Sequence, residues 1–179
     1  KDSMKNDYKI GDTKISIPPT VLFTAVAVLD DVRKVVSMDA KRAGDVVYVL
    51  GDTRDEMGGS EFLALRGQLG SNVPKTDAVK SRALYERLSS AIAQGLVASC
   101  HDCSDGGLAV ALAETAFAGG LGMDVDIRPV GLENDAVALF SESQGRFVAT
   151  VRPDQAAAFE SALAGSSFAK LGVVTAEPL

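Results

Sequence analysis

His101-Asp102-Cys103-Ser104-Asp105-Gly106-Gly107-Leu108 lies between an apolar run, Gly95–Ser99, and an alanine-rich segment. This order predicts a strand, a glycine turn and a helix in succession. A helix N-terminus carries unpaired N–H groups and the positive end of the helix dipole, so the turn is suited to a phosphate. Asp102 is placed to hold Mg²⁺ against that phosphate. The same residues also fit an ordinary helix cap, with Ser104 or Asp105 as the capping residue.

Strands and helices alternate along the rest of the chain. The run at 20–29 is apolar throughout, which predicts a central strand covered on both sides. Apolar residues recur at three- and four-residue spacing over 76–94, which predicts an amphipathic helix that ends at Gly95. About six strands and four or five helices predict an α/β (α+β) layered domain with a mixed sheet covered by helices. The remaining strands are expected at 45–51, 96–101, 122–127, 146–151 and 169–174, and the remaining helices at 61–65, 107–118, 133–140 and 154–164.

The composition limits the classes of partner. The 179 residues are 46% hydrophobic, which suits one compact domain with a substantial core. The formal net charge is −6 and Lys and Arg do not cluster, which argues against a nucleic-acid partner. The sequence has no long apolar run and no charged-then-apolar leader, so we expect no membrane span, no signal peptide and a cytoplasmic location.

The two cysteines, Cys100 and Cys103, have the spacing of a redox pair or of half a zinc site. Zinc needs further ligands, and the chain has one histidine and no second cysteine pair. A redox pair predicts a thiol pKa well below about 8.5. The alternative is two reduced thiols without a chemical role.

Four stretches, in order, resemble one known family: Lys1–Met4, Gly51–Glu61, His101–Leu108 and Ser141–Phe147. They are similar to the C-terminal-type domain of phosphoribosylformylglycinamidine synthases, a domain shared with aminoimidazole ribonucleotide synthetase and other relatives. The synthase core contains two pairs of N-type and C-type domains, and this chain resembles the second C-type copy. The resemblance implies a linker from a missing N-type domain at 1–19 and a C-terminal-type domain at 20–179.

The resemblance also implies a reaction. Family members convert formylglycinamide ribonucleotide to its amidine, using ATP and ammonia derived from glutamine. The implied cofactors are ATP or ADP and Mg²⁺. The implied partners are the missing N-type and C-type domains of the same parent chain and a glutaminase domain or subunit. We expect the fragment alone to be inactive, and it could form a homodimer through the surface that an N-type domain would cover.

Family positions transfer to this sequence residue by residue. Asp102 matches a Mg²⁺ ligand and Ser104 matches a nucleotide-phosphate contact, with the rest of the turn, Asp105, Gly106 and Gly107, around the phosphate. Ser3 matches a linker serine that contacts the substrate. Lys1 stands where small forms of the synthase have a metal-binding Asn, so it cannot be that ligand. A substrate-binding triplet of the first C-type copy matches Glu142, Ser143 and Gln144, although in a second copy these residues could simply preserve the framework.

Two alternative functions remain open at the level of the sequence. One is a fragment of another ATP-using relative, such as aminoimidazole ribonucleotide synthetase. The other is a domain that holds a nucleotide as a permanent structural ligand. No catalytic residue is expected in the chain, because the family's catalytic histidine lies in an N-type domain. His101 is instead expected to be a hydrogen-bonded packing residue.

Overall fold

The computed structural model describes residues 3–4, 7–16, 20–21 and 23–177, which form two units, Lys1–Val32 and Arg33–Leu179. This division falls after Val32. The domain boundary after residue 19 that the family resemblance implies stays a prediction. In the first unit, β1 (Ser3–Met4) pairs antiparallel with β4 (Thr20–Val21), and β2 (Asp7–Ile10) pairs antiparallel with β3 (Thr13–Ser16). A short 3₁₀ helix, η1 (Val32–Lys34), spans the division.

The predicted central strand at 20–29 is wrong over the residues that follow β4. Residues 23–29 form neither helix nor strand. Phe23, Val26 and Val28 are all more than 80% exposed. An apolar run predicts burial, but a strand also needs a neighbouring strand for its backbone hydrogen bonds, and none of the described residues supplies one here.

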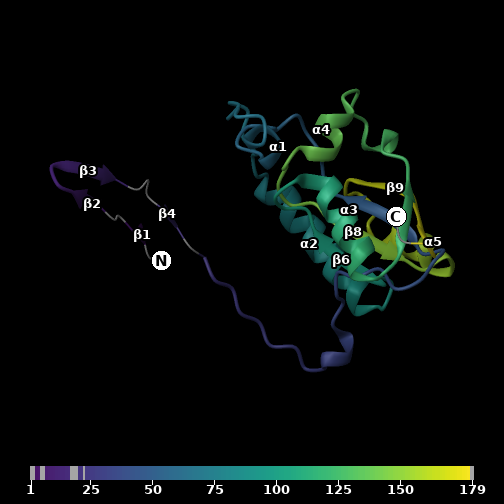
Figure 1. Cartoon of the computed structure of the whole chain (residues 1–179). Helices are drawn as coiled ribbons and strands as arrows, with labels where there is room; N and C mark the ends of the chain where they lie inside the picture. Colours follow the sequence, from purple (N-terminus) through teal and green to yellow (C-terminus); the bar gives the residue numbers. More distant parts are fainter. Residues whose placement is uncertain (1–2, 5–6, 17–19, 22, 178–179) are drawn as a thin grey trace. The chain divides into compact units, whose positions relative to one another are not determined.

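The second unit is built around one antiparallel sheet (Figure 1). It has five strands in the order β6-β8-β5-β9-β7. The strands are β5 (Val46–Leu50), β6 (Ser99–Asp102), β7 (Gly122–Val125), β8 (Phe147–Val151) and β9 (Phe168–Thr175). The layered α/β class is confirmed, but every strand pair in this sheet is antiparallel, so the sheet is not mixed.

The sheet is covered on both faces. Successive side chains of β5 point to opposite faces, so Val46, Tyr48 and Leu50 pack with α2 and α5 in one core, and Val47 and Val49 pack with α3 in the other. All five residues of β5 are buried. A strand buried on both faces gives a continuous apolar run, and this is why the sequence identified β5 as a central strand.

The helices agree with the sequence pattern to within a few residues. α2 (Ala78–Ala93) begins after Asp77, whose carboxylate accepts hydrogen bonds from the Val79 and Lys80 amides. None of the helices in the described part of the chain is long and apolar enough to cross a membrane. Besides α2, the second unit has the α-helices α1 (Glu61–Ala64), α3 (Gly107–Ala118), α4 (Asp135–Phe140) and α5 (Ala156–Ala162) and the 3₁₀ helices η2 (Arg128–Val130) and η3 (Pro153–Gln155).

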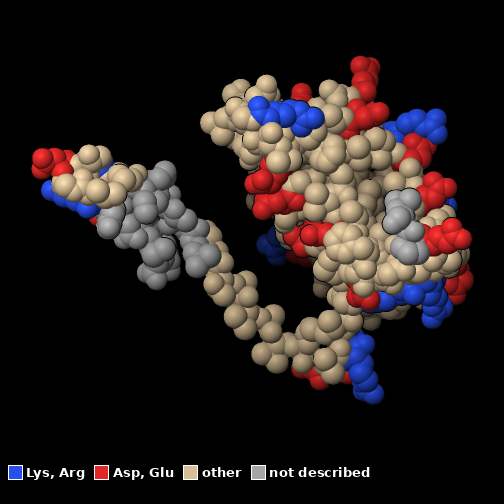
Figure 2. Space-filling view, in the orientation of Figure 1, with Lys and Arg blue, Asp and Glu red and all other residues tan. Residues whose placement is uncertain are grey.

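Charged side chains of both signs are interspersed on the visible face of this unit, and that face has no continuous basic surface (Figure 2). This distribution agrees with the overall net charge of −6.

Candidate functional site

The glycine turn connects the end of the edge strand β6 to the start of α3. Gly106 and Gly107 have φ values of +77° and +65°, a backbone conformation that residues with a Cβ atom rarely adopt. Gly106 is the N-cap of α3 and provides no side-chain cap. The alternative that Ser104 or Asp105 caps the helix is therefore wrong.

Asp102 and Ser104 lie together on the exposed side of the turn. The Ser104 hydroxyl donates a 2.7 Å hydrogen bond to Asp102 Oδ2. This bond is the main cause that lowers the pKa of Asp102, and the neighbouring His101 ring adds to the effect. His101 Nε2 lies 2.8 Å from Glu114 Oε2, so the histidine is a hydrogen-bonded packing residue, as the sequence suggested. Asp102 therefore presents a charged carboxylate at neutral pH.

The two glycine amides already have partners within the protein. Gly106 N–H donates to Glu142 Oε1 at 2.9 Å, and Gly107 N–H donates to the Ser104 carbonyl at 3.0 Å. The same Glu142 oxygen also accepts from the Glu61 amide at 2.9 Å, at the start of α1. One carboxylate thus joins the glycine turn, the start of α1 and the loop after α4. The side chains of Asp102, Ser104 and Asp105 remain available for a nucleotide.

The loop after α4 is also hydrogen-bonded to the segment that follows β5. Ser143 Oγ accepts a 3.1 Å hydrogen bond from the Arg54 amide, and Ser141 Oγ donates to the Arg54 carbonyl at 2.6 Å. Both serines are fully buried. Ser143 therefore has a structural contact in this chain, whereas Gln144 is exposed and bonds only the Glu142 carbonyl among the described contacts.

The buried side chain of Arg146 forms hydrogen bonds with this loop, a role that the sequence analysis missed. Arg146 is 1% exposed, and its guanidinium donates to the carbonyls of Ser141 and Ser143 and to Thr53 Oγ1. Burial lowers the pKa of Arg146, because removal from water disfavours the charged form. The available signal was a charged residue at the first position of the predicted strand 146–151.

Two family positions belong to the first unit. Ser3 is in β1 of the first unit, but its side chain is outside the described residues. Lys1 is outside them altogether. The substrate contact at Ser3 therefore stays a prediction.

The metal site predicted at Asp102 would need ligands from elsewhere. Within the described residues, no group of three or more His, Cys, Asp or Glu side chains could hold a metal ion. The exposed, charged carboxylate of Asp102 is nevertheless suited to Mg²⁺, because this ion is commonly bound through one or two carboxylates, substrate phosphates and water. Asp102 fits the role of a single protein ligand.

The two cysteines lie in surroundings that disfavour the thiolate form. Burial raises the pKa of Cys100 to about 12 and that of Cys103 to about 11. Both thiols are free. A redox pair predicted a lowered thiol pKa, and the raised values argue against that alternative.

Removal of the Glu142 carboxylate should loosen the whole arrangement. We expect Glu142→Ala to lower the free energy of unfolding by about 2 kcal/mol, because two amides lose a charged acceptor. Glu142→Gln should lose less, since its amide oxygen still accepts. Urea denaturation measures both, with Glu133→Ala, a change at an exposed loop residue, as the control. Equal stability of Glu142→Ala and the control would contradict the bridging role.

The comparison with family models decides the family. Residues 42–179 match the model described as AIR synthase related protein, C-terminal domain. The chain belongs to this family. The AIR synthase related domain thus covers the sheet, its helices and the whole glycine turn.

Two curated relatives of this AIR synthase related domain are PurL subunits. The subunit PurL of phosphoribosylformylglycinamidine synthase from Alkaliphilus metalliredigens is 43% identical over 142 residues, which are 79% of this chain and 19% of that protein. The PurL subunit from Limosilactobacillus fermentum is 42% identical over 161 residues, 89% of this chain and 21% of that protein. The chain spans about a fifth of the length of these relatives.

A solved structure shows the same fold. T. maritima PurL complexed with FGAR superimposes with a TM-score of 0.72 at 24% identity, over 82% of this chain and 26% of that chain. At this identity the similarity establishes the architecture of the AIR synthase related domain, and it does not transfer ligand contacts.

Proposed function

We propose that this chain is one domain of a phosphoribosylformylglycinamidine synthase and supplies it with a nucleotide- and Mg²⁺-binding turn at Asp102–Gly107. The observation that carries the proposal is the 43% identity to a PurL subunit over 79% of the chain. The names of the reported relatives favour this enzyme over aminoimidazole ribonucleotide synthetase. Structures of T. maritima PurL complexed with ATP and with ADP, which share the fold, support a nucleotide as the ligand.

In the proposed reaction the amide oxygen of formylglycinamide ribonucleotide accepts the γ-phosphoryl group of ATP. Ammonia then attacks the amide carbon, the carbon–oxygen bond breaks, and phosphate leaves with that oxygen. Ammonia would come from a glutaminase domain or subunit, and the other catalytic groups from the remaining domains of the parent enzyme. The reaction is that of an ATP-dependent C–N ligase, and this chain contributes binding rather than a catalytic group.

The contribution of the chain follows from the exposed side of the turn. Ser104 can turn its hydroxyl from Asp102 toward a phosphate oxygen, since both groups lie on the same side of the turn. The charged Asp102 would hold Mg²⁺, which neutralises phosphate charge when bound. Gly106 and Gly107 shape the turn, while Glu142 keeps the Gly106 amide occupied.

Calorimetry of ADP binding with and without Mg²⁺ tests this proposal on the 179-residue chain and on the full-length parent enzyme. We expect Asp102→Asn to weaken Mg²⁺-dependent ADP binding about tenfold or more. Asp126→Asn should leave it unchanged, because Asp126 is paired with Arg128 at an exposed turn. An unchanged affinity in Asp102→Asn would overturn the site.

The parent enzyme separates two versions of the proposal. If Asp102→Asn removes both nucleotide and amidine formation, the turn is part of the working site. If it removes one nucleotide per chain and leaves amidine formation intact, the nucleotide is a structural ligand.

A further inference from the structure

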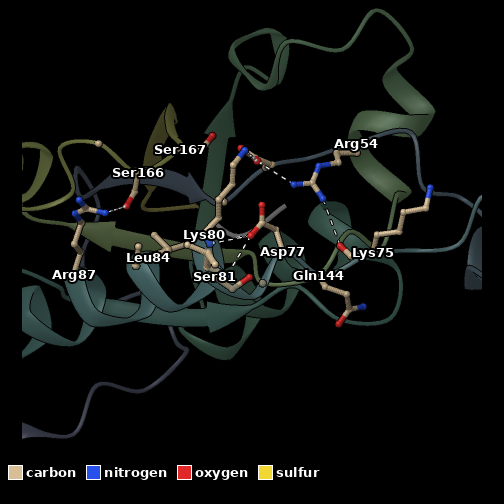
Figure 3. A pocket seen from close by; sticks show the side chains of 16 residues that line it. Arg54, Lys75, Asp77, Lys80, Ser81, Leu84, Arg87, Gln144, Ser166 and Ser167 are labelled. Carbon is tan, nitrogen blue, oxygen red and sulfur yellow. Dashed lines mark hydrogen bonds and ion pairs between the residues drawn. The ribbon is translucent and has the colours of Figure 1, made fainter.

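A hollow separate from the glycine turn lies beside the N-terminal half of α2 (Figure 3). Its other walls are the Gly51–Arg54 segment after β5 and the Gly165–Ser167 loop before β9, with Gln144 and Gly145 at its border. Its volume is about 390 Å³, within the range of small-molecule sites. None of Asp102, Ser104 and Gly106 lines it.

The hollow collects positive charge in an acidic protein. Four cationic side chains and two carboxylates line it, a formal excess of two positive charges, whereas the whole chain carries −6. Figure 3 shows the Lys75 ammonium directed away from the other cations. The cations that remain directed at the hollow are Arg54, Lys80 and Arg87.

The two carboxylates are already satisfied. Asp52 lies 3.1 Å from the Arg54 guanidinium and 3.4 Å from the Lys80 ammonium, and a hydrogen bond from Ser167 is the largest cause that lowers its pKa. Asp77 accepts the first amides of α2. Asp77 therefore also neutralises the N-terminus of the helix, and the attraction for an anion must come from side chains.

Arg87 is the cation without an acidic partner. Its side chain is half-buried, and its Nη1 donates a 3.1 Å hydrogen bond to Ser166 Oγ. No carboxylate of the described residues lies within ion-pair distance of it. A guanidinium offers several N–H donors in a planar fork that matches phosphate oxygens. Arg87 and Ser166 thus form one end of the hollow, where further guanidinium N–H groups of Arg87 can donate to a ligand.

The opposite end and the wall between suit the body of such a ligand. Lys80 precedes Arg87 by seven residues, two helical turns or about 10 Å along α2. Leu84 lies between them and, with Val79 and Ala83, forms an apolar wall. At the Lys80 end, Asp52, Arg54 and Lys80 offer both acceptors and donors for polar groups.

We propose that this hollow binds a phosphorylated small molecule, a phosphate monoester whose phosphate contacts Arg87 and Ser166 and whose polar body reaches the Asp52–Arg54–Lys80 cluster. This site is independent of the proposed nucleotide turn. It gives the domain a second anion-binding position, with Gln144 and Gly145 at its border.

Titration of the 179-residue chain with glucose 6-phosphate, glucose and inorganic phosphate tests the site, followed by ¹H–¹⁵N NMR and calorimetry. We expect the phosphate monoester to bind more tightly than either inorganic phosphate or glucose, with shifts at the amides of Ser166 and Ser167. Arg87→Gln should weaken binding of the monoester about tenfold, because one charged donor is lost. Lys80→Gln, a change at a side chain that is 70% exposed, should weaken it without affecting folding.

Arg82→Gln is the matched control. Arg82 is on the same helix, but its side chain is 82% exposed, is paired with Glu86 and does not line the hollow. An equal loss of affinity in Arg82→Gln would show general electrostatic attraction and overturn the site. Absence of binding to the folded wild-type chain at millimolar glucose 6-phosphate would also overturn it.

Asp102→Asn distinguishes the two proposals. If Asp102→Asn loses glucose 6-phosphate binding while Arg87→Gln retains it, the ligand lies at the glycine turn. That result would refute the site in the hollow and support the nucleotide site at the turn. If Arg87→Gln loses glucose 6-phosphate and Asp102→Asn retains it, the hollow is supported whatever happens to ADP binding.

Discussion

Gly107→Ala is expected to lower the free energy of unfolding by about 4 kcal/mol. Gly107 has φ +65°, which already disfavours any residue with a Cβ. An added Cβ would also meet the Ser141 carbonyl oxygen and would lie 2.9 Å from that of Leu139. These contacts are backbone atoms at the end of α4, so α3 and α4 would have to move apart. Chemical denaturation monitored by circular dichroism measures the change.

Gly120→Ala is the matched control for this prediction. Gly120 follows the same helix and has the same φ of +65°, but nothing lies within 4 Å of an added Cβ. That variant should lose only the conformational term, about 1 to 2 kcal/mol. If the two variants lose equal stability, the close approach of the turn to α4 does not contribute to the loss of unfolding free energy in Gly107→Ala.

Arg146→Met is expected to cost about 4 kcal/mol of unfolding free energy. The guanidinium is buried and donates to two carbonyls and a hydroxyl, which lose their partners when it is removed. Arg146→Lys should fall between wild type and Arg146→Met, because an ammonium cannot reproduce the planar fork. Thermal and urea unfolding of the three proteins give the order.

Arg128→Met is the control for the buried arginine. The Arg128 side chain is 88% exposed and is paired with Asp126, so its removal should leave the free energy of unfolding close to that of the wild type. A loss of similar size in Arg146→Met would mean that the loop after α4 is held by its serines rather than by the arginine.

Much of the second unit was predictable because its signals are local. The helix at 107–118 matches α3, and the helix at 76–94 contains α2, because helical periodicity and the terminating glycine are encoded by neighbouring residues. The strand at 45–51 contains β5, whose burial on both faces leaves an unbroken apolar run.

The failures have a common physical origin. The run at 20–29 has the composition of a central strand, but strand formation requires a pairing partner that composition does not reveal. The mixed sheet was inferred from alternating elements, yet strand direction depends on how the connections cross the sheet. Both properties depend on residues distant in sequence.

The sequence alone determined the order of the elements, the glycine turn and the family resemblance, because these depend on side-chain periodicity and on residues that tolerate positive φ. The tertiary structure decided how the turn is used. Glu142 reaches Gly106 across 36 residues, and Ser143 reaches Arg54 across 89. The hollow beside α2 likewise combines four separate segments. Such contacts form when the folded sheet and helices bring distant residues together, and no local pattern records them.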